Sequence, residues 1–212
     1  MDNSLSDRIL SPTLYRVHWD RLFEDLEGQL AAEWEAERAV LDAESERLRI
    51  AKLTLRTRLR RLSHDAALIG LRLAGGERRS VRVHAVGADW IAVQTDDVGG
   101  ALVVPLAAVT SVETAHGALL STLEDAPLPA DELRERMTFG FLMRDLARRR
   151  TPLRFSLRDG EGLHGTIDRA GADHLDLAVH DPGQARRADA VRAFRIIPFD
   201  AILSARMEGA AL

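Results

Sequence analysis

Residues 85–95 read AVGADWIAVQT and residues 169–180 read RAGADHLDLAVH, and the two stretches match at an offset of 84. In each, Gly-Ala-Asp is followed by a ring-bearing residue, Trp90 or His174, and then by alternating apolar residues. Further pairs at the same offset are Leu71 with Phe155, Leu73 with Leu157, Gly76 with Gly160 and Val83 with Ile167. A repeat of this length predicts an internal duplication of one structural unit.

Each half of the chain contains apolar residues with the two-residue period of β-strands. Turn sequences separate them in the first half, at Gly75-Gly76, Gly87-Ala88-Asp89 and Asp97-Val98-Gly99-Gly100. The register changes only before the last strands, where Pro105 and Pro198 are 93 residues apart. The second half therefore has about nine extra residues in one hairpin, where an insertion costs little.

A helical pattern precedes the first strands. We expect a flexible tail over residues 1–13 and one long amphipathic helix over residues 14–62, with a break near Gly28. The apolar residues Trp34, Leu41, Leu48, Leu55 and Leu62 recur every seven positions. A coiled coil needs a second apolar position in each heptad. Glu37 and Glu44 interrupt that second seam, so the pattern favours packing on a partner surface and leaves self-pairing open.

The remaining boundaries follow from composition. We expect the first strand-rich unit over residues 63–115 and a proline-containing linker over residues 116–130. A second helix is expected over residues 131–150, with Asp131 as its N-cap, and the second strand-rich unit over residues 151–212. The predicted fold class is α+β, with a long N-terminal helix followed by two tandem five-stranded β-barrels, each preceded by a helix.

The order of a helix and five short strands resembles the Sm-like family of small barrels. The stretch LRDGEGLHGTIDRAGADHLDL is similar to that family's first motif, and RIIPFDAILSA and LVVPLAAVTSV are similar to its last two strands. The resemblance covers most of residues 55–115 and 138–207. The chain as a whole also resembles a family of high-GC Gram-positive bacteria, with no assigned activity, that pairs a WDRLFEDLE-type start with such barrels.

The resemblance implies a set of functional expectations. Sm-like proteins form rings and bind RNA through a base-stacking residue near the Asp turn, a place that Trp90 and His174 hold in this sequence. The family's Asn near that turn and its Arg-Gly in the last turn have no counterpart here. SH3-like and PRC-type barrels would give a similar strand pattern and bind proteins instead. The two barrels are expected to pair with each other through their open edges.

Charge is distributed unevenly, although the chain as a whole has a net charge of only −4. Residues 20–46 contain ten acidic and two basic residues, and residues 47–61 contain seven basic and no acidic ones. This distribution suits the dipole of a solvated helix. It also allows an anion-binding patch, which could join two other basic clusters. The candidate nucleic-acid-binding residues are Arg56, Arg58, Arg60, Arg61, Trp90, Arg148, Arg149, Arg150, His174, Arg186 and Arg187.

Several kinds of chemistry lack a sequence signature here. The chain has no cysteine, which excludes disulfides and thiol chemistry and fits a cytoplasmic protein. It has no phosphate-binding loop motif, no serine elbow, no signal peptide pattern and no membrane-length apolar run. A strand face with His174, Asp176 and His180, beside His164 and Asp168, could hold a metal or support acid–base chemistry, but exposed barrel faces often have such residues without a ligand. We therefore expect no catalytic residue, no metal and no cofactor.

The sequence thus predicts a non-enzymatic interaction or scaffold protein built from duplicated small barrels. Its partner would be another protein or a second copy, bound through the N-terminal helix and the barrel edges, and no membrane. The alternative is an RNA- or DNA-binding regulator that uses the arginine-rich patches. Phosphate contacts release counterions, so salt-sensitive binding of nucleic acid would separate the two hypotheses.

Overall fold

The computed structural model describes residues 12–95, 101–129, 132–183, 187 and 189–207. The chain divides into two units, residues 1–53 and residues 54–212, which are treated separately below. Where it is described, the first unit is helical and the second contains ten strands and several short helices. The predicted α+β class and the long N-terminal helix are confirmed. No helix among the described residues is both long and apolar enough to cross a membrane.

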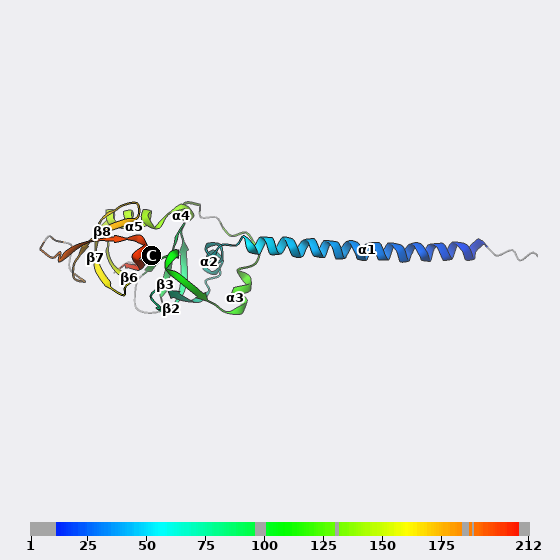
Figure 1. Ribbon diagram of the computed structural model, residues 1–212, viewed down its shortest axis with the longest axis horizontal. Coiled ribbons are helices and arrows are strands. Elements are labelled where there is room, and N and C mark those ends of the chain that lie inside the picture. Colours follow the sequence, from blue (N-terminus) through cyan, green and yellow to red (C-terminus); the bar gives the residue numbers. More distant parts are fainter. Residues whose placement is uncertain (1–11, 96–100, 130–131, 184–186, 188, 208–212) are drawn as a thin grey trace, which may run out of the picture. The chain divides into compact units, whose positions relative to one another are not determined.

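The helix predicted over residues 14–62 is divided in two. Helix α1 runs from Pro12 to Ala51, and α2 runs from Leu55 to His64 (Figure 1). Gly28 lies inside α1, so the expected break near it is wrong. The helices separate at Thr54, which has an extended backbone and caps α2. Its side-chain oxygen accepts a hydrogen bond from the amide of Thr57 at 3.1 Å. Threonine favours this N-cap position over the interior of a helix, which explains the break.

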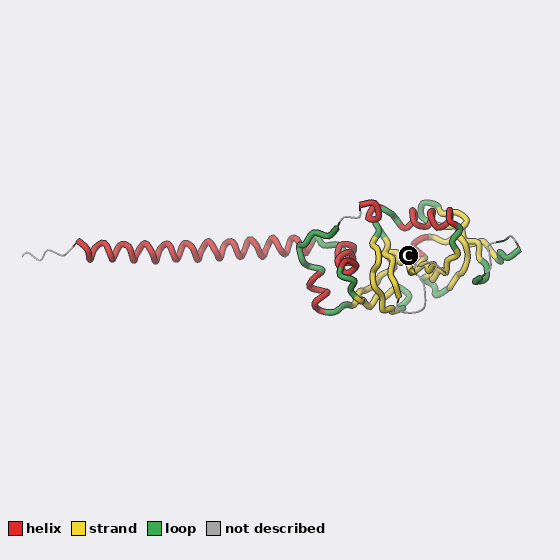
Figure 2. The backbone as a smooth tube through the Cα atoms, turned by 180° about the vertical axis from the view of Figure 1, so that it is seen from behind, coloured by secondary structure: helices red, strands yellow, loops and turns green. Residues whose placement is uncertain are grey.

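The described strands form one antiparallel sheet of ten strands in the order β5-β1-β2-β3-β4-β10-β6-β7-β8-β9. Figure 2 shows the strands in yellow. The first set contains β1 (Leu68–Leu73), β2 (Arg78–Val86), β3 (Trp90–Thr95), β4 (Ala101–Pro105) and β5 (Val109–Glu113). The second set contains β6 (Pro152–Leu157), β7 (Gly162–Ala170), β8 (His174–Val179), β9 (Ala193–Pro198) and β10 (Ile202–Met207). The sheet is not closed, and this strand pairing does not confirm the two separate five-stranded barrels that the sequence predicts.

The two strand sets have corresponding element bounds. β1, β2 and β3 begin and end 84 residues before β6, β7 and β8. β4 and β9 both end in proline and are each followed by a short 3₁₀ helix, Leu106–Ala108 or Phe199–Ala201, at an offset of 93. A register shift in β2 between Val83 and Ala85 has its counterpart in β7 between Ile167 and Arg169. Such bulges bend a strand strongly, so both long second strands curve at the same point.

Glycine sets the first turn of each set. Gly76 and Gly160 follow β1 and β6 and have φ angles of 81° and 89°. Residues with a Cβ atom rarely adopt this left-handed backbone, whereas glycine adopts it without a steric cost. The turn predicted from Gly75-Gly76 is therefore present where the sequence indicated it.

Three short helices connect the two strand sets. The expected linker over residues 116–130 contains α3 (His116–Ser121), and the helix expected over residues 131–150 is divided into α4 (Glu132–Arg136) and α5 (Phe139–Arg149). Thr138 caps α5 by accepting a hydrogen bond from the amide of Phe141 at 3.2 Å, as Thr54 does for α2. Asp131, the predicted cap, lies outside the described residues. Helix α2 packs on β2, and α5 packs on β7.

Two hydrophobic clusters form the interior of the second unit. One contains Leu59 and Leu62 of α2 with apolar side chains of β1–β4. The other contains α5 and the second strand set, and it also includes Trp90, Ala101 and Val103 from the first set. The second cluster therefore extends across the junction at which β4 pairs with β10. Burial of apolar area is the main stabilising contribution to such a junction, so the two strand sets form one packed unit.

Candidate functional site

The arginines of α2 bind the segment that connects the two strand sets. Arg56 donates to the backbone oxygens of Gly87 and Glu135, both at 2.8 Å. Arg58 donates to the hydroxyl of Thr122 at 2.9 Å, and Arg61 donates to the carbonyl of Ala126 at 2.7 Å. These guanidinium groups replace water as hydrogen-bond partners of the backbone and hydroxyl oxygens, so this face of α2 holds the connection in place.

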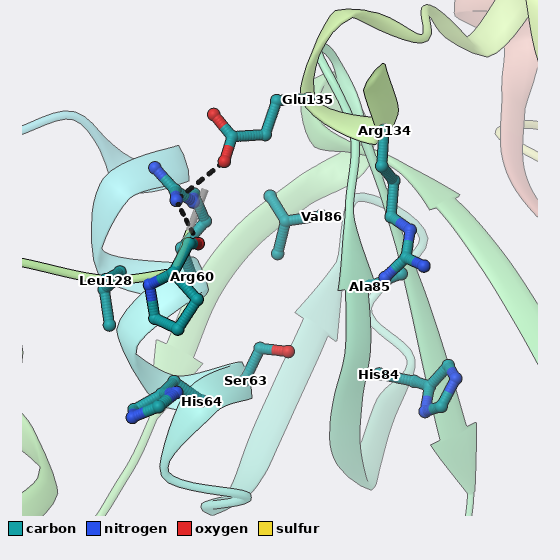
Figure 3. Close-up of a pocket in the computed structure, with 10 residues that line it drawn as sticks. Arg60, Ser63, His64, His84, Ala85, Val86, Leu128, Arg134 and Glu135 are labelled. Carbon is teal, nitrogen blue, oxygen red and sulfur yellow. Dashed lines mark hydrogen bonds and ion pairs between the residues drawn. The ribbon is translucent and has the colours of Figure 1, made fainter. Parts of the chain in front are cut away.

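Arg60 completes this set of contacts and lines a small hollow. Its guanidinium lies 2.6 Å from the carboxylate of Glu135 and 3.3 Å from the carbonyl of Pro129 (Figure 3). The hollow has a volume of about 140 Å³ and lies between α2, β2, the connection and α4. His64 and His84 also line it. Two of its charged groups, Arg60 and Glu135, bind each other, and its volume is well below the few hundred Å³ typical of ligand pockets.

The other predicted arginines have different partners. Arg148 and Arg149 both bind the carboxylate of Asp145 on their own helix, and the bond to Arg148 is the main reason that the pKa of Asp145 lies below its usual value. Arg150 is exposed at the C-terminal cap of α5, and Arg187 is exposed in the β8–β9 connection. Arg186 lies outside the described residues. The α2 cluster and the α5 cluster thus use separate sets of partners.

Trp90 and His174, which have corresponding positions, lie in different surroundings. Trp90 is only 5% exposed, and its indole nitrogen donates to the carbonyl of Met137 at 2.9 Å. The neighbouring Asp89 accepts a hydrogen bond from the amide of Phe139, the first residue of α5, at 2.6 Å. Asp89, in the turn of the first set, therefore caps α5. Trp90 is a packing residue, and the faces of its ring are covered in this structure.

The turn of the second set faces solvent. His174 is half-exposed, and its Nδ1 atom lies 2.8 Å from the carboxylate of the exposed Asp173. This hydrogen bond is the main cause that holds the pKa of Asp173 below its usual value. Asp173 and His174 thus bind each other, whereas the corresponding residues Asp89 and Trp90 bind the start of α5.

Two of the histidines expected on an exposed strand face, His164 and His180, are buried instead. His164 and His180 form an edge-to-face ring pair with centroids 5.0 Å apart. His180 places Nδ1 3.1 Å from the carbonyl of Asp181 and Nε2 2.9 Å from the hydroxyl of Thr166. Since a carbonyl only accepts, Nδ1 of His180 donates to the carbonyl of Asp181. These groups satisfy one another, and the described residues contain no cluster of three or more metal-ligating side chains.

Two exposed apolar surfaces stand out among the described residues. On α1, considered by itself, Leu30, Trp34, Leu41 and Leu48 are exposed and recur at helical spacing. On β9, Phe194 is 66% exposed and Ile196 is 75% exposed. Their counterparts on β4, Ala101 and Val103, are 7% and 2% exposed. Sequence analysis did not identify the β9 surface, although the alternation in AFRIIP gives a signal, because alternation alone does not say which face remains uncovered.

Comparison of the chain with protein-family models, with curated proteins and with solved structures found no match.

Proposed function

We propose that the protein is a non-enzymatic interaction or scaffold protein, in which a strand-rich module carries a long helical arm that binds another protein. The apolar stripe of α1, formed by Leu30, Trp34, Leu41 and Leu48, supports this proposal most directly. Contiguous exposed apolar surface is uncommon on soluble proteins and marks interaction sites. An isolated helix gains little stability in water, so a partner that covers the stripe would also stabilise α1.

The charge of α1 indicates the kind of partner. Residues 20–46 have ten acidic and two basic residues, so a second copy of this stretch would bring like charges together. A helix with an apolar face flanked by lysine or arginine would instead complement both the stripe and its acidic borders. The proposed partner of the arm is therefore a basic amphipathic helix of another protein.

We further propose that each strand set is a small five-stranded barrel resembling those of the Sm-like family. Two observations support this finer description. The first set has the order β5-β1-β2-β3-β4 and the second the same order, β10-β6-β7-β8-β9. In each set a bulge bends the long second strand at the corresponding place, which is how small barrels turn their corners.

Binding of RNA or DNA remains the alternative prediction. The arginines of α2 favour it less, because Arg56, Arg58, Arg60 and Arg61 each hydrogen-bond to a protein oxygen of the connection. A titration with labelled mixed-sequence RNA at about 50 and 200 mM salt would measure it, because phosphate-driven binding falls steeply over that range. Micromolar affinity that falls with salt and with Arg148→Glu plus Arg149→Glu would favour the alternative.

The test of the proposed function changes the stripe and compares it with a matched control. Leu30→Glu, Trp34→Glu and Leu41→Glu together place three acidic groups in the stripe. Ala32→Glu, Ala39→Glu and Ala43→Glu add the same charge on the opposite, equally exposed face of α1. All six positions tolerate glutamate in a helix, so circular dichroism should report the same helical content for both variants.

Affinity purification followed by reconstitution from purified components gives the readout. We expect a protein that binds the wild type and the control variant, is lost from the stripe variant, and binds through a basic helix with salt-dependent affinity. Equal binding by the stripe and control variants would overturn the proposal. So would an absence of any reconstituted complex together with salt-dependent binding of RNA.

A further inference from the structure

A partly enclosed cavity lies in the second unit, apart from the hollow beside Arg60. It has a volume of about 140 Å³ and lies between α2, β5 and α3. Its apolar lining consists of Leu55, Leu59, Leu62, Val112 and Leu119. Leu59 and Leu62 are buried, whereas Leu55 and Leu119 are 45% and 41% exposed. The cavity therefore has a buried apolar floor that a small molecule can reach from solvent.

The polar part of the lining contains one hydroxyl that is satisfied and one that is not. Thr122 accepts a hydrogen bond from Nε of Arg58 at 2.9 Å and donates to the carbonyl of Leu119 at 2.6 Å. The hydroxyl oxygen of Thr114 is buried and has no hydrogen-bond partner among the described residues. A buried hydroxyl without a partner costs free energy, so the exception needs a physical explanation.

Arg58 adds a positive charge to the same lining. Arg56 and Arg60 lie 3.6 Å and 2.6 Å from the carboxylate of Glu135. Arg58 is half-buried, and no carboxylate among the described residues forms an ion pair with it. Its bond to Thr122 uses only Nε, and the other guanidinium donors have the planar geometry that fits a carboxylate. An anionic group would thus complement the charge of the cavity.

Water alone is a poor occupant of this space. A buried water molecule typically makes about three hydrogen bonds, and the apolar walls offer none. In contrast, an apolar cavity of roughly 150 Å³ is large enough to bind benzene. The volume therefore suits one small ring or a short hydrocarbon chain. The hollow beside Arg60 has a similar volume, but there Arg60 is paired with Glu135.

We propose that this cavity binds a small monocarboxylate whose apolar body is about the size of one ring, such as an aromatic acid or a short-chain fatty acid. The apolar body packs against Leu59, Leu62 and Val112. Arg58 pairs with the carboxylate, and Thr114 donates its hydroxyl to one carboxylate oxygen. The bound acid supplies the partner that the Thr114 hydroxyl lacks. This inference does not depend on the role proposed for α1.

Three probes with the same ring and different head groups test the class of ligand. Benzoate, benzyl alcohol and benzylamine are titrated into the full-length protein, and methyl NMR signals of Leu59, Leu62 and Val112 are followed. We expect benzoate to shift these signals with a dissociation constant on the order of 1 mM, which is reasonable for so small a ligand. Benzyl alcohol should bind roughly tenfold more weakly, and benzylamine should not bind. Equal affinity for all three probes, or shifts confined to other methyl groups, would overturn the proposal.

Thr114→Val tests the hydroxyl without disturbing the free protein. The variant keeps the shape of the side chain and removes no hydrogen bond seen among the described residues, so the melting temperature should not fall. Its affinity for benzoate should fall roughly three- to tenfold, because the ligand loses one hydrogen bond. Ser111→Ala, exposed on β5, is the matched control and should bind benzoate normally. Unchanged affinity in Thr114→Val would contradict the assigned contact.

A second variant and a thermal measurement keep the test independent of the hydroxyl. Val112→Phe places a ring in the cavity and should abolish benzoate binding while circular dichroism stays the same. At 10 mM benzoate, about ten times the expected dissociation constant, the wild-type melting temperature should rise by roughly 3 °C. Val112→Phe should show no rise. A wild type that shows neither the rise nor the methyl shifts would overturn the inference, whatever the outcome for α1.

Discussion

β4 and β9 have the same place in their strand sets and the same final proline, yet their surroundings differ. β4 lies between β3 and β10 and is buried along its whole length, whereas among the described residues β9 has only β8 as a neighbour. The side chains follow this difference: small Ala101 and Val103 fit a closed junction, and larger Phe194 and Ile196 extend into solvent. The comparison teaches that one structural unit can serve as an interior junction in one copy and as an available surface in the other.

The largest expected effect separates the two turns that precede β3 and β8. Trp90→Ala removes a buried ring from the cluster shared by both strand sets, so the free energy of unfolding should fall by about 3–5 kcal/mol. His174→Ala, at the corresponding half-exposed position, should change it by less than about 1 kcal/mol. Urea unfolding followed by circular dichroism measures both. Similar losses in the two variants would show that the second turn is also covered.

The glycine turns should behave alike in both sets. Gly76→Ala and Gly160→Ala each force a left-handed backbone on a residue with a Cβ atom, at a cost of about 1–2 kcal/mol. Gly117→Ala, inside α3 with open space around it, is the control and should be neutral or stabilising by up to about 1 kcal/mol. Thermal unfolding gives the order of the three variants. An unchanged melting temperature for Gly160→Ala would argue against the strained turn.

Corresponding arginines on α2 and α5 give a smaller contrast. Arg60 binds the carboxylate of Glu135, and Arg144 binds the carbonyl of Gly171 at an exposed site, 3.0 Å away. After allowance for partial solvent screening, Arg60→Ala should lower the free energy of unfolding by about 1 kcal/mol. Arg144→Ala should lower it by no more than about 0.5 kcal/mol. Equal losses would mean that Arg60 does not hold the connection. If Arg60→Ala left stability unchanged and lowered RNA affinity, the result would support the nucleic-acid hypothesis.

The smallest effect concerns pH at the β5 edge. The hydrogen bond from Arg78 holds the pKa of the Glu113 carboxyl below its usual value. A lowered folded-state pKa contributes stability that is complete above the unfolded-state value and is lost as the pH falls through the folded-state value. Arg78→Gln should therefore raise the Glu113 pKa and reduce the acid sensitivity of unfolding. NMR titration of the Glu113 carboxyl measures it, and an unchanged pKa would exclude Arg78 as the cause.

Local sequence signals predicted a large part of the fold because their causes are local. Period-two alternation located β1–β3 and β6–β8, and the turn glycines located the first hairpin of each set. The boundaries of the long helices were predicted less well. Thr54 and Thr138 each begin a new helix, yet a threonine in a run of good helix formers is compatible with a cap or with a helix interior.

The placement of the candidate site residues could not be predicted in the same way. The arginine run of α2 has the composition of an anion-binding patch, but its guanidinium groups bind carbonyl and hydroxyl oxygens 31 to 79 residues away along the chain. His164 and His180 lie where alternation predicts an outer face, yet β7 is buried on both faces from Leu163 to Ile167 and the two rings pack against each other. Both outcomes depend on which distant segments meet.

The sequence by itself determined the α+β class, the long helix, the strand positions and the correspondence between the two halves, because periodicity, glycine turns and an offset of 84 are properties of neighbouring residues. Only the tertiary structure decided which copy of each element is covered. Trp90 and Val103 are buried because β10 and α5 pack on the first strand set, while His174 and Ile196 have no such neighbours among the described residues. Burial depends on long-range contacts, and two nearly equivalent sequences therefore acquire different roles.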